Sequence, residues 1–119
     1  MGRNEPQPGE TVESRFAALR LRFCERATAE ARALERMIDK LQDRQEGGPP
    51  ELEVQAEIRR IAHSLCGGGG TFGYAAISAR AAELEELVLD HPDSPALAAV
   101  CRALVTEVRR LPAPTGAAA

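Results

Sequence analysis

Apolar residues recur along most of the chain at steps of three and four positions, and no window alternates apolar and polar residues with a period of two. Steps of three and four match the turn of an α-helix, so each such stretch predicts an amphipathic helix. Clusters of glycine and proline interrupt the pattern at residues 1–11, 45–50 and 90–95 and from residue 111 onward. Because such clusters mark chain ends and turns, the pattern predicts an all-α protein.

Four helical stretches fit between these turns. They are expected at about residues 12–44, 51–67 or slightly beyond, 71 or 72 to 89, and 94–111. The first is long for one helix, so we expect a break or kink near Ala27 and Thr28 that separates a short leading helix from a longer one. Ser94 and Pro95 are a favoured N-cap and first helical residue for the last. Short connections make neighbouring helices antiparallel, which predicts an up-down antiparallel four-helix bundle, with or without a short extra N-terminal helix.

The length of 119 residues fits one domain, which can bury a core without help from a metal or a disulfide. We expect a flexible N-terminus at residues 1–11, the bundle at 12–111 and a flexible tail at 112–119. Three widely spaced cysteines with no CxxC pair suit a reducing compartment. The sequence shows neither a signal-peptide core nor a run of about 18 apolar residues, so a cytoplasmic protein with no membrane segment is expected.

Charge adds information about partners. The formal net charge is -3, and arginine and glutamate are interleaved along the chain. A nucleic-acid-binding protein would show a concentrated basic patch, so this distribution argues against nucleic acid as a partner. A protein or a small molecule is favoured instead.

The segment IAHSLCGGGGTFGY, residues 61–74, holds the one histidine that falls within a predicted helix. At about 100° per residue, His63 lies about 160° around the helix from Leu65, on the side away from the apolar stripe. The imidazole of His63 is therefore expected to face water.

Four consecutive glycines follow this histidine. Each would cost about 0.5–1 kcal/mol relative to alanine inside a helix. Cys66, Gly67 and Gly70 share the face of His63, and bare backbone beside the ring would let the surface of a second protein close over it. A flexible helix end without function is the alternative interpretation.

These residues resemble the signature of histidine-containing phosphotransfer (HPt) domains. That signature has a histidine, a leucine two positions later, glycines four and ten positions later, and a Leu-Glu pair one helix further on. The matching residues here are His63, Leu65, Gly67, Gly73, Leu84 and Glu85. The stretch from Gly67 to Phe72 is especially similar to the phosphotransfer domain at the amino terminus of chemotaxis-type sensor kinases.

The resemblance implies that His63 is the phospho-acceptor. An imidazole is largely neutral near pH 7 and offers a nitrogen lone pair for in-line attack on phosphorus. The resemblance also implies that Glu85 on the next helix orients the ring, although Glu85 is equally well one charge of a solvated acidic cluster. A family lysine three positions after the histidine is Cys66 here, so Arg59, four positions before His63, is the candidate source of positive charge. The other interpretations are that Arg59 is an ordinary surface residue and that the partner supplies all the charge.

The resemblance implies a monomeric phosphorelay intermediate that passes a phosphoryl group between a histidine kinase or receiver domain and a response regulator aspartate. The chain lacks the boxes of an ATP-binding kinase domain, so it is not expected to be an autonomous kinase. We expect no cofactor on this chain, with Mg²⁺ held by the partner receiver or kinase domain. The receiver is expected to dock on the His63 face of its helix and on the helix of residues 77–89.

Two other classes of function stay open. One is an HPt-like binding module that sequesters a receiver or kinase without chemistry. The other is a zinc site built from His63 and Cys66 with a third ligand, for which the candidates are Cys24, His91 and Cys101. A nucleotide-binding loop is disfavoured, because no strand precedes the glycines and no Gly-Lys-Ser/Thr closes them.

Overall fold

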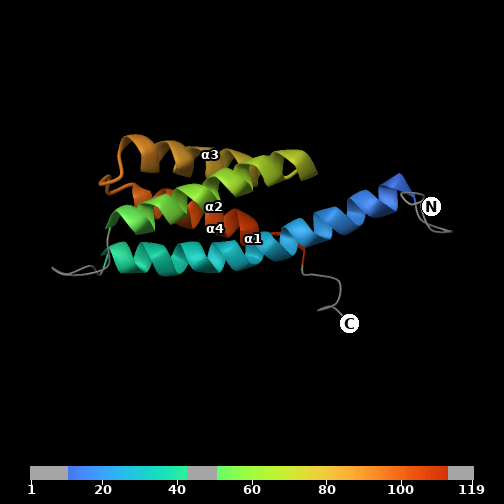
Figure 1. The fold of residues 1–119 in the computed structure, drawn as a ribbon, viewed down its shortest axis with the longest axis horizontal. Coiled ribbons are helices and arrows are strands. Elements are labelled where there is room, and N and C mark those ends of the chain that lie inside the picture. Colours follow the sequence, from blue (N-terminus) through green and yellow to red (C-terminus); the bar gives the residue numbers. More distant parts are fainter. Residues whose placement is uncertain (1–10, 43–50, 113–119) are drawn as a thin grey trace.

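The computed structural model describes residues 11–42 and 51–112, and none of these lies in a β-strand. Four helices follow one another: α1 (Val12–Gln42), α2 (Glu51–Phe72), α3 (Ala75–Asp90) and α4 (Leu97–Arg109). Each helix packs against its neighbours in sequence, and α1 also packs against α4, so the four close into a bundle (Figure 1). The predicted all-α four-helix bundle is confirmed. Residues 1–10 and 113–119, which make up most of the two predicted flexible ends, lie outside the described residues.

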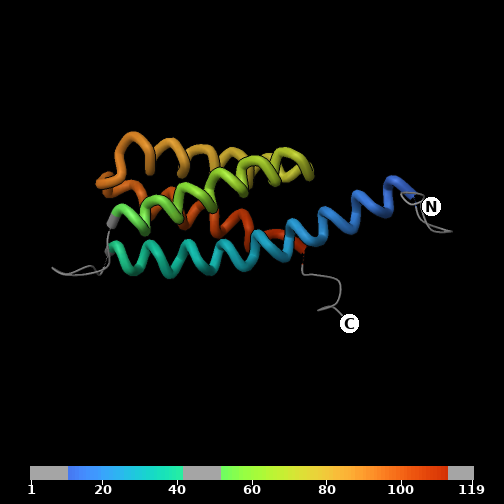
Figure 2. The backbone as a smooth tube through the Cα atoms, in the orientation of Figure 1, coloured from blue at the N-terminus to red at the C-terminus, as the bar shows by residue number. Residues whose placement is uncertain are grey.

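The first helix is continuous over Val12–Gln42, so the break or kink expected near Ala27 and Thr28 does not divide it into two helices. Thr11 caps it: the Thr11 Oγ1 accepts a hydrogen bond from the Ser14 backbone N–H at 3.0 Å, and the Ser14 Oγ accepts one from the Thr11 N–H at 2.9 Å. The axis changes direction between the blue and teal parts of the tube (Figure 2). In this helix the Thr28 Oγ1 donates to the Cys24 carbonyl oxygen at 2.9 Å. Such a side-chain bond to the preceding turn bends a helix without breaking it.

The N-terminal part of α1 projects past the other three helices (Figure 1). The apolar stripe of α1 continues into this part, so Phe16 and Leu19 remain 37% and 49% exposed. The Phe16 ring packs on the ring of Phe72 with centroids 5.2 Å apart. This contact ties the projecting part of α1 to the end of α2.

The core of the bundle is apolar, and no polar or charged side chain is buried in the part of the chain that the structure describes. Its fully buried large side chains come from all four helices and are Phe23, Leu34, Ile58, Ile61, Leu65, Leu84, Leu104, Val105, Val108 and Cys101. Because aliphatic side chains carry most of this core, the spacing of Leu, Ile and Val in the sequence predicted it well. Among the described helices, none is long and apolar enough to cross a membrane.

The glycine run lies inside α2, which continues to Phe72 instead of ending near Gly67. A Cβ on Gly68 would meet the ring of Phe23 from α1, and a Cβ on Gly69 would lie 2.9 Å from the Ser78 backbone nitrogen of α3. These two glycines let the neighbouring helices come close, and the packing gained offsets the weak helix propensity of glycine. The predicted end of this helix was therefore about five residues too early.

The turn after α2 is a glycine-terminated helix end. Gly73 has a φ of +87°, and the Tyr74 N–H donates to the Gly69 carbonyl oxygen at 2.7 Å. This pattern is a Schellman motif, in which a left-handed glycine ends the helix. Because the motif occupies Gly73 and Tyr74, α3 begins at Ala75, later than the predicted residue 71 or 72.

The last helix also begins later than predicted. Ser94 accepts a hydrogen bond from the Ala96 N–H on its Oγ at 3.1 Å, and one from the Leu97 N–H on its carbonyl oxygen at 3.1 Å. A bond spanning three residues belongs to a tighter turn than an α-helix. Ser94 and Pro95 therefore start this turn, and the regular helix α4 begins at Leu97.

The three cysteines are free thiols in different surroundings. Cys24 is buried with its Sγ 3.4 Å from the Tyr74 Oη, and Cys101 is buried with its Sγ 3.9 Å from the Leu34 carbonyl oxygen. Burial raises the pKa of the Cys101 thiol to about 12. Cys66 is only half-buried.

Two glycine substitutions should have opposite effects on stability. Gly69→Ala places a methyl group against backbone atoms of Tyr74 and Ser78, so we expect a loss of about 1–3 kcal/mol in the free energy of unfolding. Gly67→Ala meets nothing within 4 Å and should add about 0.5–1 kcal/mol through helix propensity. Denaturant melts followed by circular dichroism measure both values. Equal effects of the two substitutions would contradict the packing described here.

Thiol reactivity should separate the cysteines. Because Cys24 and Cys101 are buried and Cys66 is partly exposed, an aromatic disulfide reagent should modify Cys66 at least about tenfold faster than the two buried thiols in the native protein. Cys66→Ser should remove the fast phase and leave the slow phases unchanged. Fast modification of Cys101 in the folded protein would contradict its placement in the core.

Candidate functional site

His63 lies on the outer face of α2, with 78% of its side chain exposed. Ile61 and Leu65, two positions to either side, are buried on the opposite side of the same helix. This arrangement follows from the helical period, which turns residue 63 away from the stripe that packs in the core. The exposed imidazole expected from the sequence is thus present in the fold.

Glu85 of α3 meets this imidazole. The Glu85 Oε2 lies 2.8 Å from the His63 Nδ1, although the two residues are 22 positions apart in sequence. Leu84 and Val88, on the same helix as Glu85, are fully or almost fully buried and hold α3 in place against the core. The Glu85 side chain is 22% exposed, so the neighbouring helices cover most of it, whereas the imidazole that it meets is open to solvent.

The contact with Glu85 distinguishes the two ring nitrogens. An ionised carboxylate only accepts hydrogen bonds, so Nδ1 carries the proton and donates a hydrogen bond to the Glu85 Oε2. A neutral imidazole has one protonated nitrogen, and its lone pair is then on Nε2. Nε2 has no hydrogen-bond partner within the described parts of the chain. His63 therefore presents an oriented nucleophilic nitrogen to solvent.

Two arginines adjoin the histidine. Arg59 and Arg60 line a shallow cavity of about 320 Å³ together with Ala56, His63 and Glu85. Arg59 is exposed, and it forms no ion pair with any residue that the structure describes. Arg59, four positions before His63, is the cation expected from the sequence. Arg60 was not expected, although a spacing of three also places two residues on one helical face.

Arg60 is held by two carboxylates. Its Nε and Nη2 donate to the two oxygens of Glu57 at 3.0 and 2.6 Å, and its Nη1 lies 3.6 Å from the Glu30 Oε2 of α1. The hydrogen bond from Arg60 lowers the pKa of the Glu57 carboxyl, and burial raises the pKa of Glu30 against the attraction of Arg26 and Arg60. Arg60 thus connects α2 to α1 beside the site.

The other predicted contact residues lie further along α2. Ser78 of α3 donates through its Oγ to the Cys66 carbonyl oxygen at 2.8 Å, and the Cys66 Sγ lies 3.7 Å from the same Oγ. A Cβ on Gly67 would meet nothing within 4 Å, and one on Gly70 would only touch the Ser78 Oγ at 3.6 Å. The backbone at these two glycines is therefore open. Small residues of α2 and α3 also line a depression here, namely Gly69, Gly70, Gly73, Ala75, Ser78, Ala79 and Ala82.

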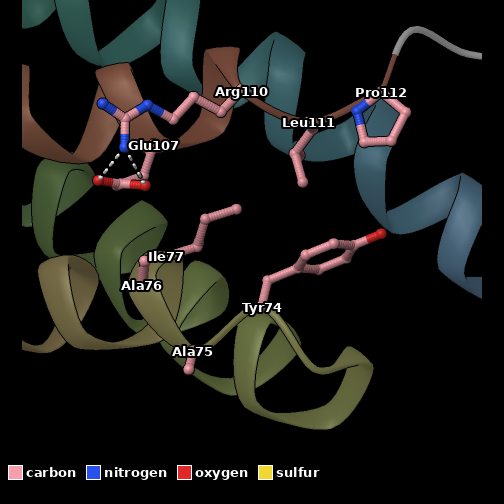
Figure 3. Close-up of a pocket in the computed structure, with 8 residues that line it drawn as sticks. All are labelled: Tyr74, Ala75, Ala76, Ile77, Glu107, Arg110, Leu111 and Pro112. Atoms are coloured by element: carbon pink, nitrogen blue, oxygen red, sulfur yellow. Dashed lines mark hydrogen bonds and ion pairs between the residues drawn. The ribbon is translucent and has the colours of Figure 1, made fainter.

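A third cavity lies between the N-terminus of α3 and the C-terminus of α4 (Figure 3). Tyr74, Ile77 and Leu111 point toward its interior, and an ion pair of 3.3 Å joins Arg110 to Glu107 at its edge. This cavity contains none of the residues that the sequence analysis selected. The His63 cavity is therefore the candidate site.

The residues suggested as zinc ligands do not form a cluster among the described residues. In the part of the chain that the structure describes, no group of three His, Cys, Asp or Glu residues could hold a metal ion. Cys24 contacts Tyr74, Cys66 contacts Ser78, and Cys101 contacts the Leu34 backbone.

Comparison with protein families adds independent information. The family model of the Hpt domain matches residues 18–112, which is most of the chain. Searches of curated proteins and of solved structures gave no significant match. The resemblance to HPt domains stated from the residues around His63 is confirmed, whereas the finer similarity to chemotaxis-type sensor kinases stays a prediction. The chain belongs to the Hpt domain family, and its role is phosphotransfer in two-component signalling.

Proposed function

We propose that His63 accepts a phosphoryl group and passes it to an aspartate of a response regulator. The donor is the aspartyl phosphate of a receiver domain or the ATP-bound catalytic domain of a histidine kinase. The observation that carries this proposal is the exposed imidazole whose Nδ1 lies 2.8 Å from the Glu85 carboxylate. HPt domains typically act in the cytoplasm, and we propose the same compartment for this chain.

In the proposed step, the Nε2 lone pair attacks the phosphorus of the donor in line with the bond that breaks. The N–P bond forms, the P–O bond to the donor aspartate breaks, and the aspartate leaves as a carboxylate. The proton on Nδ1 stays in place, so the step needs no general base. The positive charge that develops on the imidazole lies beside Glu85, which stabilises it. Transfer to the response regulator is the same step in reverse.

Arg59 is proposed to contact the phosphoryl group in place of the family lysine, whose position Cys66 occupies. A thiol supplies no positive charge, whereas a guanidinium is a strong phosphate ligand. Arg59 lines the same cavity as His63 and has no competing ion pair among the described residues. These two facts favour Arg59 as the cation.

The proposed partner surface extends from His63 over Cys66, Gly67 and Gly70. The open backbone at the glycines would let a receiver domain bring its aspartyl phosphate within bonding distance of Nε2. The Mg²⁺ that assists the transfer is expected in the partner, where it neutralises the phosphoryl oxygens.

Labelling tests the role of His63. Incubation with a phosphorylated receiver domain should put label on the chain that is lost in acid and survives base, as a phosphoramidate does. His63→Gln should abolish the label and change the free energy of unfolding by less than about 0.5 kcal/mol, because the side chain is exposed.

Glu85→Ala should keep the label but slow its appearance about tenfold or more, since the ring loses its orienting carboxylate.

The matched control is His91→Gln, which removes the other histidine and should not reduce labelling. A chain that co-elutes with a receiver but never becomes labelled would contradict the proposal and support a binding module without chemistry. Undiminished labelling of His63→Gln would assign the acceptor to another residue.

Gly67→Leu tests the partner surface. The new side chain points into open space, so the fold and the labelling by the small donor phosphoramidate should be unchanged. Labelling by a receiver domain should slow by about tenfold or more, because a branched side chain would stand between the two proteins. Thr106→Leu, at an exposed position of α4, is the control and should leave both rates unchanged. Equal transfer rates from the receiver to Gly67→Leu and to the wild type would contradict the docking surface.

A further inference from the structure

Two arginines lie within one turn of His63, and they differ in how they are held. Arg59 forms no ion pair with a described residue, whereas Arg60 meets Glu57 through two hydrogen bonds and approaches Glu30 as well. Both side chains line the His63 cavity. Side chains three or four positions apart on a helix are neighbours, with Cβ atoms about 5–6 Å apart. Either guanidinium can therefore reach a group attached to His63.

Arg60 binds Glu57 more closely than it binds Glu30. The two bonds to Glu57 form a forked pair, which is the favoured geometry between a guanidinium and a carboxylate. The contact with Glu30 is 3.6 Å, which is longer than a hydrogen bond. The other oxygen of Glu30, Oε1, is buried and accepts no hydrogen bond from a described residue, although the Arg26 Nε lies 3.9 Å from it. Glu30 is thus an incompletely satisfied partner.

The pair with Glu57 is also accessible to competition. The side chains of Arg60 and Glu57 are 57% and 40% exposed, so water already surrounds much of the contact. Exposed ion pairs of this kind contribute little to stability. A phosphoryl group on Nε2 carries up to two negative charges and three acceptor oxygens, and it would compete for the same guanidinium.

We propose that Arg60 is a second phosphate-binding residue, whose guanidinium stays bound to Glu57 and Glu30 until His63 is phosphorylated. This inference rests on the proposed function of His63. In the free chain the two carboxylates retain Arg60 and leave Arg59 as the available cation. After transfer, the phosphoryl oxygens draw Arg60 from Glu57, and the phosphorylated form gains a second guanidinium. Glu57 and Glu30 thereby lower the affinity of the site for the phosphoryl group, which favours its onward transfer.

The test uses phosphoramidate as the donor, so no partner protein is needed. In this reaction the N–P bond of phosphoramidate breaks, ammonia leaves, and the new N–P bond forms at His63 Nε2. The Nε–H signals of the arginines are followed by ¹⁵N NMR before and after labelling. The Arg60 signal should move when His63 is phosphorylated, and Glu57→Gln should also move it in the unphosphorylated chain, because both changes remove the contact with the Glu57 carboxylate.

Arg109 provides the matched control. It pairs with Glu35 at 2.6 Å across α4 and α1, its side chain is 64% exposed, and it does not line the His63 cavity. Its signal should not move when His63 is labelled. Glu35→Gln removes this pair and should leave the labelled fraction unchanged.

The labelled fraction at fixed phosphoramidate and ammonia gives a second readout. Glu57→Gln should raise the ratio of labelled to unlabelled chain about threefold to tenfold, since a charge-assisted contact becomes available. The same substitution in an Arg60→Gln background should have less than half of this effect on a logarithmic scale, because Arg60 carries it. Because the Glu57 side chain is 40% exposed, Glu57→Gln should leave the chain folded. Circular dichroism verifies that the variant is folded.

The outcomes separate this inference from the function on which it rests. Labelled His63 with an unmoved Arg60 signal, or an equal effect of Glu57→Gln in both backgrounds, overturns the inference and leaves the function standing. Absence of label from His63 overturns both.

Discussion

The close approach of α2 and α3 is the constraint on which the site depends. A Cβ on Gly69 would lie only 2.9 Å from the Ser78 backbone nitrogen, and the Ser78 Oγ donates to the Cys66 carbonyl oxygen at 2.8 Å. These contacts fix the spacing of the two helices near the turn at Gly73. Further along the same antiparallel pair, the spacing brings Glu85 within 2.8 Å of the His63 Nδ1. The orientation of the imidazole is therefore a consequence of helix packing about two turns away.

The sequence predicted helix type and core well, because both follow from the period of apolar residues. Ile61 and Leu65 face the core, and residue 63 on the same helix faces water, as a turn of 3.6 residues requires. The pairing of His63 with Glu85 was expected only through the family resemblance. Periodicity places each residue on its own helix, but the register between two helices depends on side-chain packing that a single sequence does not encode locally.

The errors have a common physical origin. Local propensity disfavours four glycines in a helix, so the predicted end of α2 came near Gly67, whereas contacts with Phe23 and Ser78 extend the helix to Phe72. The division of α1 was wrong for a related reason, since the Thr28 side chain bends the helix without ending it. The spacing of three between Arg60 and His63 was available from the sequence, but the contact of Arg60 with Glu30 of α1 depends on how the helices pack. In each case a contact that the local sequence pattern does not contain decided the structure.

The four glycines of α2 now divide into two pairs with different physical explanations. Gly68 and Gly69 face α1 and α3, where a side chain would collide with the neighbouring helix. Gly67 and Gly70 face open space or a single flexible hydroxyl, so alanine would fit at both positions and would favour the helix by about 1–2 kcal/mol in total. No contact among the described residues compensates for that loss. A bare helical surface beside an oriented imidazole is, however, what the close approach of a second protein requires. Helix packing does not explain Gly67 and Gly70, whereas the proposed phosphotransfer explains both.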